Sequence, residues 1–271
     1  MGNLVKTPQS EVNATLETLD RFGVTPDHLA RLRAEPDYAK RIAEFMLRGG
    51  LEGSVHHKLA RALMGKNFFG VEEWATLFNV QFTKKQLRQV AEFPCGEDIL
   101  NSTCPLCGKS VKECHFAFVG LDRLNGYPLT ILTWQELYPA TGQPKFYSYV
   151  PQAWYSEQKF AKETTMKFRW YLLHQNILPG SENRTFDDQM KMLTADYEMP
   201  SAIAEVTKDL FVFKKAGNYV NLSRYARTAC VSSFGGHVGV GLFVGGWLSV
   251  NCWSDSPVSA FGVAASRKFP S

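Results

Sequence analysis

Cysteine and histidine side chains gather in one short stretch of this chain, and no other part of the sequence carries equally specific chemistry. The stretch 93–116, FPCGEDILNSTCPLCGKSVKECHF, contains four of the six cysteines and one of the six histidines. Within it, Cys104 and Cys107 are separated by two residues and are followed by Gly108 and Lys109. That spacing places two thiolates on a tight turn from which both can reach one tetrahedral ion. The pattern therefore predicts a structural zinc site.

The predicted zinc ligands are drawn from five residues, Cys95, Cys104, Cys107, Cys114 and His115. A closed zinc site needs four sulfur or nitrogen ligands at about 2.0–2.3 Å. Cys114 and His115 are adjacent and are not easily presented to one ion together, so which of them binds the metal is left open. The alternative is a loop with partly buried free cysteines. A redox role for the Cys-x2-Cys pair is disfavoured, because the motif does not lie between the strand and the helix of a βαβ unit.

A second candidate site is the segment 71–93, which predicts two short helices joined by residues 79–83. The second helix begins with Lys84, Lys85 and Arg88, and a basic first turn of this kind can contact DNA phosphates in a helix-turn-helix. Thr83 and Gln86 have the spacing of a capping box. However, the first 93 residues are almost charge-balanced, and any helical bundle contains such pairs. A structural role for this segment is therefore favoured over DNA binding.

A third candidate combines Cys230, His237 and Asp255, which are the residue types of a thiol nucleophile, its base and an orienting carboxylate. We expect Cys230 on a strand, followed by a turn that pairs Phe234 with His237 and leaves the thiol opposite residue 240 or 241. In that register thiol and imidazole lie too far apart for proton transfer. A core cysteine and a turn histidine are the favoured interpretation, and no catalytic residue is predicted.

Helices that could position these residues are expected first along residues 9–93, where apolar residues recur at helical spacing. Pro26 and Pro36 stand where the first turn of a helix tolerates proline, and Ser54 is a suitable N-cap. Beyond residue 115 the apolar period shifts towards two, which is typical of strands. Asn125-Gly126 is a strong hairpin signal.

Strands are expected at 116–124, 129–137, 167–175, 227–232, 237–245, 247–253 and 261–267, and helices at 185–193 and 201–216. Because strands and helices are segregated, the fold class is expected to be α+β, with a largely antiparallel sheet. The chain then divides into a helical domain at 1–93, a cysteine-rich junction at 94–115 and an α+β domain at 116–271.

Composition places the chain among ordinary globular proteins. Hydrophobic residues make up 45% and charged residues 21%, so a sizeable core can be buried. A formal net charge of +4 is too small to indicate nucleic acid or an anionic membrane by itself. The first 20 residues lack the apolar core of a secretory signal, and no run reaches the roughly 18 apolar residues of a membrane helix. We expect a cytoplasmic protein with reduced cysteines, which favours metal binding over disulfides.

Four segments, at 64–74, 138–149, 168–173 and 261–271, resemble those of a group of uncharacterised bacterial proteins. The resemblance extends over most of the chain and implies no activity, cofactor or partner. Taken with the motifs, it leaves a non-catalytic binding protein as the preferred function, with a protein or nucleic-acid partner and an optional structural zinc ion; nucleic acid would bind through Lys84, Lys85 and Arg88. The alternatives are a DNA-binding regulator that uses 71–93, and a thiol-dependent or metal-dependent hydrolase that uses Cys230 or Cys107.

Overall fold

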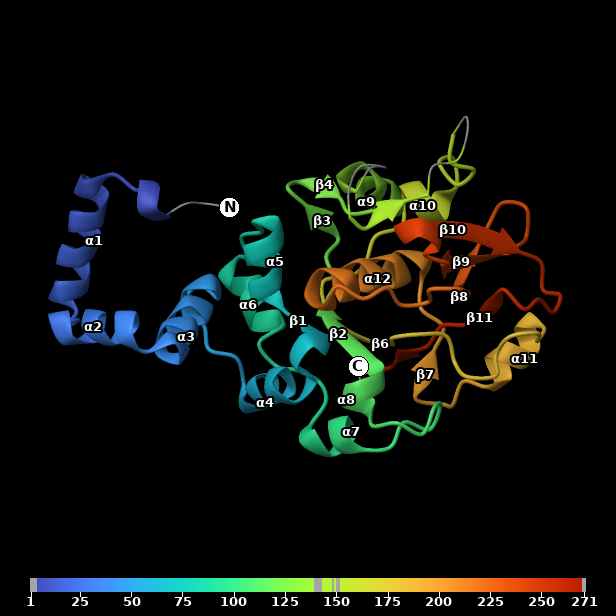
Figure 1. Ribbon diagram of the computed structural model, residues 1–271, viewed down its shortest axis with the longest axis horizontal. Helices are drawn as coiled ribbons and strands as arrows, with labels where there is room; N and C mark the ends of the chain where they lie inside the picture. Colours follow the sequence, from blue (N-terminus) through green and yellow to red (C-terminus); the bar gives the residue numbers. More distant parts are fainter. Residues whose placement is uncertain (1–3, 139–142, 148, 150–151, 270–271) are drawn as a thin grey trace. The chain divides into compact units, whose positions relative to one another are not determined.

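The computed structural model describes residues 4–138, 143–147, 149 and 152–269, and these residues form an α+β fold (Figure 1). Within this part of the chain the strands assemble into two five-stranded sheets and a two-stranded hairpin. Contacts divide the chain into two units, Met1–Glu52 with Val71–Arg88, and Gly53–Gly70 with Gln89–Ser271. Among the described residues, no helix combines the length and the apolar character that crossing a membrane requires. The expected fold class is confirmed, whereas a separate fold for residues 1–93 stays a prediction.

The first unit is helical, and its helices begin where the sequence predicts. Pro26 and Pro36 occupy the first helical position, where the N–H group that proline lacks has no helical partner anyway. The Gln86 N–H donates to Thr83 Oγ1 at 3.2 Å while Gln86 Oε1 accepts from the Thr83 N–H at 3.0 Å, so the predicted capping box is present. The helices are η1 (Leu4–Lys6), α1 (Gln9–Arg21), α2 (Pro26–Ala34), α3 (Pro36–Leu47), α5 (Val71–Phe78) and α6 (Lys84–Gln89).

The first sheet of the second unit has the strand order β1-β2-β6-β12-β7. Its strands are β1 (Phe68–Phe69), β2 (His115–Val119), β6 (Trp170–His174), β7 (Tyr197–Glu198) and β12 (Ser266–Arg267). β1 runs parallel to β2, and the remaining pairs are antiparallel. In the β2–β6 pair, His115 lies directly opposite His174. This register brings the cysteine-rich stretch, which leads into β2, to the end of β6.

The second sheet has the strand order β11-β8-β9-β10-β5. Its strands are β5 (Lys145–Phe146), β8 (Tyr225–Val231), β9 (His237–Gly241), β10 (Trp247–Trp253) and β11 (Phe261–Val263). β8, β9 and β10 form the expected antiparallel meander, while β11 and β5 join its two edges in parallel. Both sheets are therefore mixed, with antiparallel pairs in their centres.

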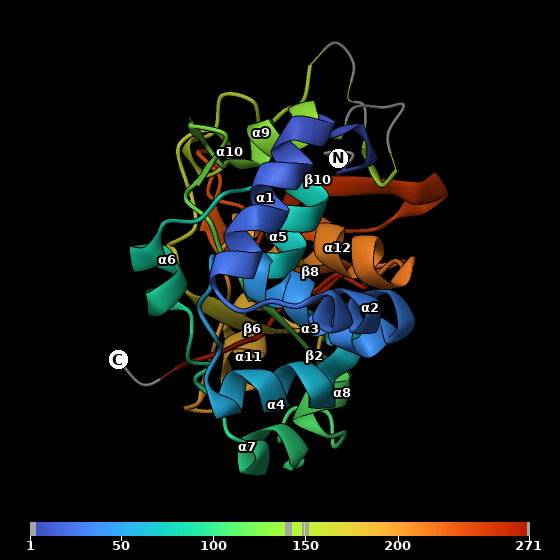
Figure 2. The same cartoon turned by 90° about the vertical axis from the view of Figure 1, so that its left-hand side faces the viewer.

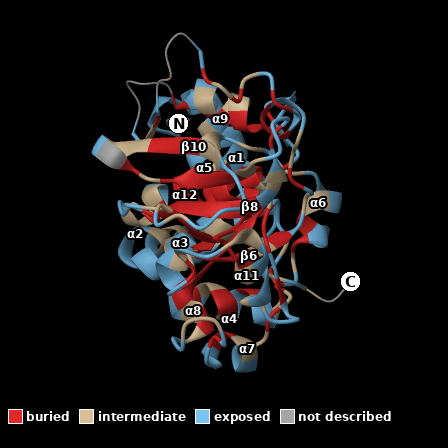
Figure 3. Ribbon diagram, turned by 90° about the vertical axis from the view of Figure 1, so that its right-hand side faces the viewer, coloured by how far each residue is buried: buried red, intermediate tan, exposed pale blue. Residues whose placement is uncertain are grey.

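Helix α12 (Ala202–Ala216) contacts both sheets, through β2 of the first and through β8 and β9 of the second. Its residues from Ala202 to Val212 are all buried, and Figure 3 shows the buried colour concentrated in α12 and the strands around it. Gly217 ends the helix with a φ of 68°, a conformation that glycine adopts without strain. α12 is thus a core helix, although three of its buried residues are ionisable: Glu205, Lys208 and Asp209.

Further helices of this unit lie outside α12. They are α4 (Val55–Met64), η2 (Gly65–Asn67), α7 (Glu97–Asn101), α8 (Val111–Cys114), α9 (Ile131–Leu137), α10 (Lys159–Lys162), α11 (Phe186–Lys191) and η3 (Val244–Gly246). Of these, α4, α8 and α11 contact strands β1, β2 and β11, respectively. The N–H of His57 donates to Ser54 Oγ at 3.0 Å, which is the predicted cap of α4. α4 and α7 lie side by side, as Figure 2 shows.

Two strand predictions are wrong for identifiable reasons. Residues 131–137 form helix α9 because Thr130 caps it, accepting the Thr133 N–H at 3.2 Å. The Asn125-Gly126 hairpin is confirmed, with positive φ at both residues, but its strands β3 (Arg123–Leu124) and β4 (Tyr127–Pro128) are only two residues long. The predicted strand 261–267 divides into β11 and β12, which belong to different sheets. Local periodicity does not reveal that crossing.

Candidate metal centre

Three cysteines and one histidine converge in the second unit. They are Cys104, Cys107, Cys114 and His174, and their potential ligand atoms all lie within 4.8 Å of one another. Ligands around a tetrahedral zinc ion lie about 3.3–3.8 Å apart, because each is about 2.0–2.3 Å from the metal. No two of these atoms are therefore more than about 1 Å farther apart than the ligands of a zinc ion. Cys104, Cys114 and His174 are buried, and Cys107 is half-buried.

The first two members of this group come from a tight turn that the sequence specifies. The N–H groups of Cys107 and Gly108 both donate to the carbonyl of Cys104, at 3.4 and 2.9 Å. The chain then returns, so that the Cys104 N–H donates to the carbonyl of Lys109 at 2.7 Å. Gly108 has a φ of +76°, which a side chain at this position would strain. The turn presents both sulfur atoms on the same side.

Cys114 is delivered by the short helix α8. Ser110 and Glu113 form a capping box at its start, and the Cys114 N–H donates to the carbonyl of Ser110 at 3.1 Å. One helical turn therefore places the third thiol next to the first two. The Cys114 sulfur also lies 3.1 Å from Nδ1 of His115.

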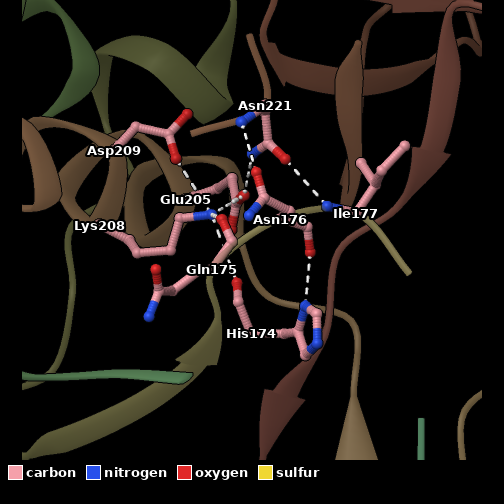
Figure 4. Close-up of polar contacts among 8 residues, drawn as sticks. All are labelled: His174, Gln175, Asn176, Ile177, Glu205, Lys208, Asp209 and Asn221. Carbon is pink, nitrogen blue, oxygen red and sulfur yellow. Dashed lines mark hydrogen bonds and ion pairs between the residues drawn. The ribbon is translucent and has the colours of Figure 1, made fainter. Parts of the chain in front are cut away.

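His174 is the fourth member, and its imidazole is oriented for metal binding. Its Nδ1 lies 2.7 Å from the carbonyl oxygen of Asn176, which can only accept, so Nδ1 carries the proton (Figure 4). Nε2 then bears the free electron pair, and it is buried without a hydrogen-bond partner among the described residues. Burial lowers the pKa of His174, which keeps the ring neutral. A neutral imidazole whose other nitrogen is held by a carbonyl is the usual form of a zinc-bound histidine.

The three thiols are electrostatically unequal. The hydrogen bond from the Cys114 thiol is the main reason that the pKa of Cys104 falls to about 5, with further help from the Leu106 N–H and the Tyr197 hydroxyl. The Tyr197 oxygen lies 3.8 Å from the Cys104 sulfur. The same hydrogen bond raises the pKa of Cys114, because its thiol is the donor. One thiolate is thus stabilised by the protein alone, and the charge of a bound ion would favour deprotonation of the others.

The backbone that carries His174 is held by the buried ionisable residues of α12 (Figure 4). The Lys208 Nζ donates to the carbonyl of Gln175 at 2.7 Å and to that of His174 at 3.4 Å. The same ammonium pairs with Glu205 Oε1 at 2.5 Å and with Asp209 Oδ1 at 3.0 Å. Lys208 therefore ties the segment after β6 to the core helix.

Protonation in this network follows from its complete burial. Burial raises the pKa of Glu205 and raises that of Asp209 to about 8. Burial alone would lower the pKa of Lys208, but the neighbouring Asp209 and Glu205 outweigh it and raise that pKa. We therefore expect Lys208 to stay charged between these two carboxyl groups, and Asp209 to keep its proton at neutral pH.

Of the five ligands predicted from the sequence, the structure brings Cys104, Cys107 and Cys114 together. Cys95 is buried before α7 and does not belong to the group of described residues that converge, and burial raises its pKa to about 11. His115 is not in the group either. Burial lowers its pKa to about 3, so its neutral ring can donate from Nδ1 to the Cys114 sulfur as an outer-shell contact. The sequence prediction did not include His174.

The residues of the predicted thiol site meet only in part. His237 Nε2 lies 3.3 Å from Asp255 Oδ1, so base and carboxylate are paired. Cys230 instead accepts the N–H of Ala202 at 3.3 Å, and burial raises the pKa of its thiol. The expected register is wrong: Val231, not Phe234, pairs with His237, because the turn between the strands is longer than expected, and the register shifts again between Arg227 and Val231. In the described part of the chain Cys230 and His237 share no hydrogen bond, which disfavours a Cys-His nucleophile.

The basic residues of the predicted helix-turn-helix, Lys84, Lys85 and Arg88, are exposed on α6. α6 has six residues, less than two helical turns, and offers little length for entry into a major groove. DNA binding by this segment stays a prediction.

Comparison of the chain with protein-family models, with curated proteins and with solved structures yields no match. The resemblance to uncharacterised bacterial proteins stays a prediction. Residues 139–142, 148 and 270–271 of the segments that carry it lie outside the described residues. Function is therefore inferred from the geometry of the site.

Proposed function

We propose that this chain is a non-catalytic binding protein whose Cys104, Cys107, Cys114 and His174 hold a structural zinc ion. The buried, unpartnered Nε2 of His174 is the observation that carries the proposal. A buried acceptor without a partner costs about 1–3 kcal/mol. Coordination of a metal by that nitrogen removes the cost, and three sulfur atoms within reach complete a donor set that zinc prefers.

A structural rather than a catalytic role follows from the number of ligands. Four protein ligands fill the tetrahedral positions, whereas a catalytic zinc ion keeps one position for water or substrate. The bound ion would supply binding free energy that fastens the turn at Cys104 and the end of α8 to strand β6. Because the binding site is assembled only in the folded state, that free energy stabilises the fold.

The first unit supports the binding half of the proposal. Among the described residues, none in α1, α2 or α3 is buried, although these helices carry large apolar side chains. Phe22, which follows α1, is 84% exposed, and Met46 of α3 is 71% exposed. Apolar side chains that stay in contact with water are frequent where a protein partner binds. A protein partner is therefore proposed for this unit.

The zinc proposal is tested by measuring metal bound to protein purified without chelator. We expect about one zinc per chain, and a lower thermal midpoint after a chelator removes it. His174→Ala and Cys107→Ser should both lose stoichiometric zinc. Loss of a ligand should weaken binding by more than the about 10- to 100-fold that loss of an outer-shell partner costs.

Two cysteine variants serve as controls. Cys252→Ser changes a half-buried cysteine on β10, outside the site, and should keep about one zinc per chain. Cys95→Ser distinguishes the proposed ligand set from the set predicted by the sequence, and it should also keep its zinc. Absence of bound metal in the wild-type chain, with all six thiols free to react, would contradict the proposal.

A further inference from the structure

A small basic cavity lies in the second unit, where strands β6, β7 and β12 meet. It has a volume of about 210 Å³ and is lined by Arg169, Arg267, Lys268, Glu198 and Ser266, with aromatic side chains between them. Three cations and one carboxylate give the lining a formal charge of +2. The cavity is therefore suited to an anion.

The guanidinium of Arg267 is only partly satisfied by its protein contacts. Its side chain is 17% exposed, so most of its surface is covered while part of it still meets solvent. It donates to the Tyr197 hydroxyl at a long 3.4 Å, and Asp196 Oδ2 lies 3.7 Å away, beyond hydrogen-bond distance. A half-buried cation with long contacts retains donors for a ligand.

The other two cations of the lining also keep hydrogen-bond donors for a ligand. Arg169 approaches the carboxylate of Glu198 no closer than 4.0 Å, and its guanidinium lies over the ring of Tyr171 at 4.9 Å. The Lys268 Nζ donates one hydrogen bond, to the carbonyl of Ala195 at 3.0 Å. Ser266, which is buried, lines the same cavity. Two guanidinium groups and an ammonium thus line the cavity and keep donors for a ligand.

We propose that this cavity binds the phosphate group of a small molecule. A phosphate monoester carries a charge of about −1.5 to −2 at neutral pH, which matches the formal charge of the lining, and it offers three strong acceptor oxygens. Two arginines can each present a planar pair of donors to such a group. A carboxylate has one negative charge and two oxygens, so it would pair with only one of the two arginines.

The experiment measures binding to the full wild-type chain by calorimetry at constant ionic strength, with inorganic phosphate, phenyl phosphate and benzoate as probes. We expect saturable binding of a phosphate probe that exceeds the binding of benzoate. Tighter binding of phenyl phosphate than of inorganic phosphate assigns the cavity to phosphate esters, and the reverse order assigns it to free phosphate. Either order supports the proposal, whereas equal binding of benzoate would overturn it.

Variants test whether the cavity itself is responsible. Arg267→Gln and Arg169→Gln should each weaken phosphate binding by about tenfold, since each removes a charged hydrogen-bond donor pair. Arg267→Lys keeps the charge but not the fork and should lose part of the affinity. Arg184→Gln removes an exposed arginine outside the cavity and should change nothing. Unchanged binding in the Arg169→Gln/Arg267→Gln double variant would refute the assignment.

A measurement without substitutions guards against variants that fail to fold. Phenylglyoxal modifies accessible arginines, and mass spectrometry identifies which ones react. Phosphate should slow the modification of Arg169 and Arg267 in the wild-type chain and leave that of Arg184 unchanged. If phosphate changed the modification rate at none of the three arginines, the proposal would be overturned.

Discussion

Replacement of Lys208 by methionine tests how strongly the buried network of α12 holds the segment that carries His174. Methionine keeps the length and apolar stem of lysine, so the substitution removes mainly the ammonium. That ammonium contacts Glu205 at 2.5 Å, Asp209 at 3.0 Å and the Gln175 carbonyl at 2.7 Å. Its loss leaves a carboxylate and a carbonyl in the core without their partner.

The expected cost is large relative to the stability of a typical domain. Breaking a buried ion pair by removing one partner costs about 3–5 kcal/mol, and an unsatisfied buried carbonyl adds about 1–3 kcal/mol. Proton uptake by Glu205, whose pKa burial already raises, offsets part of the sum. We expect Lys208→Met to lower the free energy of unfolding by about 4 kcal/mol, out of a total of about 5–15 kcal/mol.

Urea denaturation followed by tryptophan fluorescence measures the change, and the chain offers a matched control. Lys191 pairs with Asp188 at the same i, i+3 spacing and at 3.0 Å, but on an exposed helix face. Lys191→Met should therefore cost no more than about 1 kcal/mol. The Glu205→Gln/Lys208→Met double variant should lose less free energy of unfolding than the sum of the two single variants, by about 0.5–3 kcal/mol. Each single variant leaves one member of the pair without its partner, whereas the double variant removes both members. Equal effects of Lys208→Met and Lys191→Met would refute the reasoning.

Three further predictions concern other parts of the molecule. Burial raises the pKa of Asp209 to about 8, so between about pH 4 and pH 8 the folded state holds a proton that the unfolded chain has released. This group therefore makes stability fall as the pH rises towards 8. Urea midpoints at several pH values should show a flatter profile in Asp209→Asn, and identical profiles would contradict the prediction. In Gly262→Ala the added Cβ would lie 2.6 Å from Ser181 Oγ, so calorimetry should report a loss of about 1–3 kcal/mol, and an unchanged thermal midpoint would be inconsistent with this packing. We expect no measurable binding of duplex DNA at physiological salt; saturable, salt-sensitive binding that vanishes when the basic residues of α6 become alanine would instead support a DNA-binding regulator.

Local signals predict much of the fold, since caps and turns depend on neighbouring residues only. Pro26 and Pro36 begin their helices as expected, Gly217 ends α12, and β8, β9 and β10 match the predicted periodicity. The burial of α12 could not be predicted in the same way. Its Glu205, Lys208 and Asp209 have the spacing of a solvated helix face, and only the two sheets packed around the helix remove them from water.

The candidate site shows the same division. The Cys-x2-Cys turn and Cys114 are local features, and the sequence predicts their convergence. His174 lies on a strand far along the chain and has no motif around it, so its position depends on the β2–β6 pairing that sets His174 opposite His115. Cys95 is nearer in sequence, yet the chain from it enters α7 rather than the cysteine turn. Proximity along the chain therefore pointed to Cys95, whereas the fourth member of the converging group is His174.

X-ray absorption spectroscopy of the zinc-loaded protein tests the central claim most directly, because it reports the number, type and distance of the metal's ligands. The account predicts three sulfur atoms at about 2.3 Å and one imidazole nitrogen at about 2.0–2.1 Å. In His174→Ala the imidazole contribution should disappear. A spectrum with four sulfur atoms, with two imidazoles or with no sulfur would contradict the Cys104, Cys107, Cys114 and His174 centre.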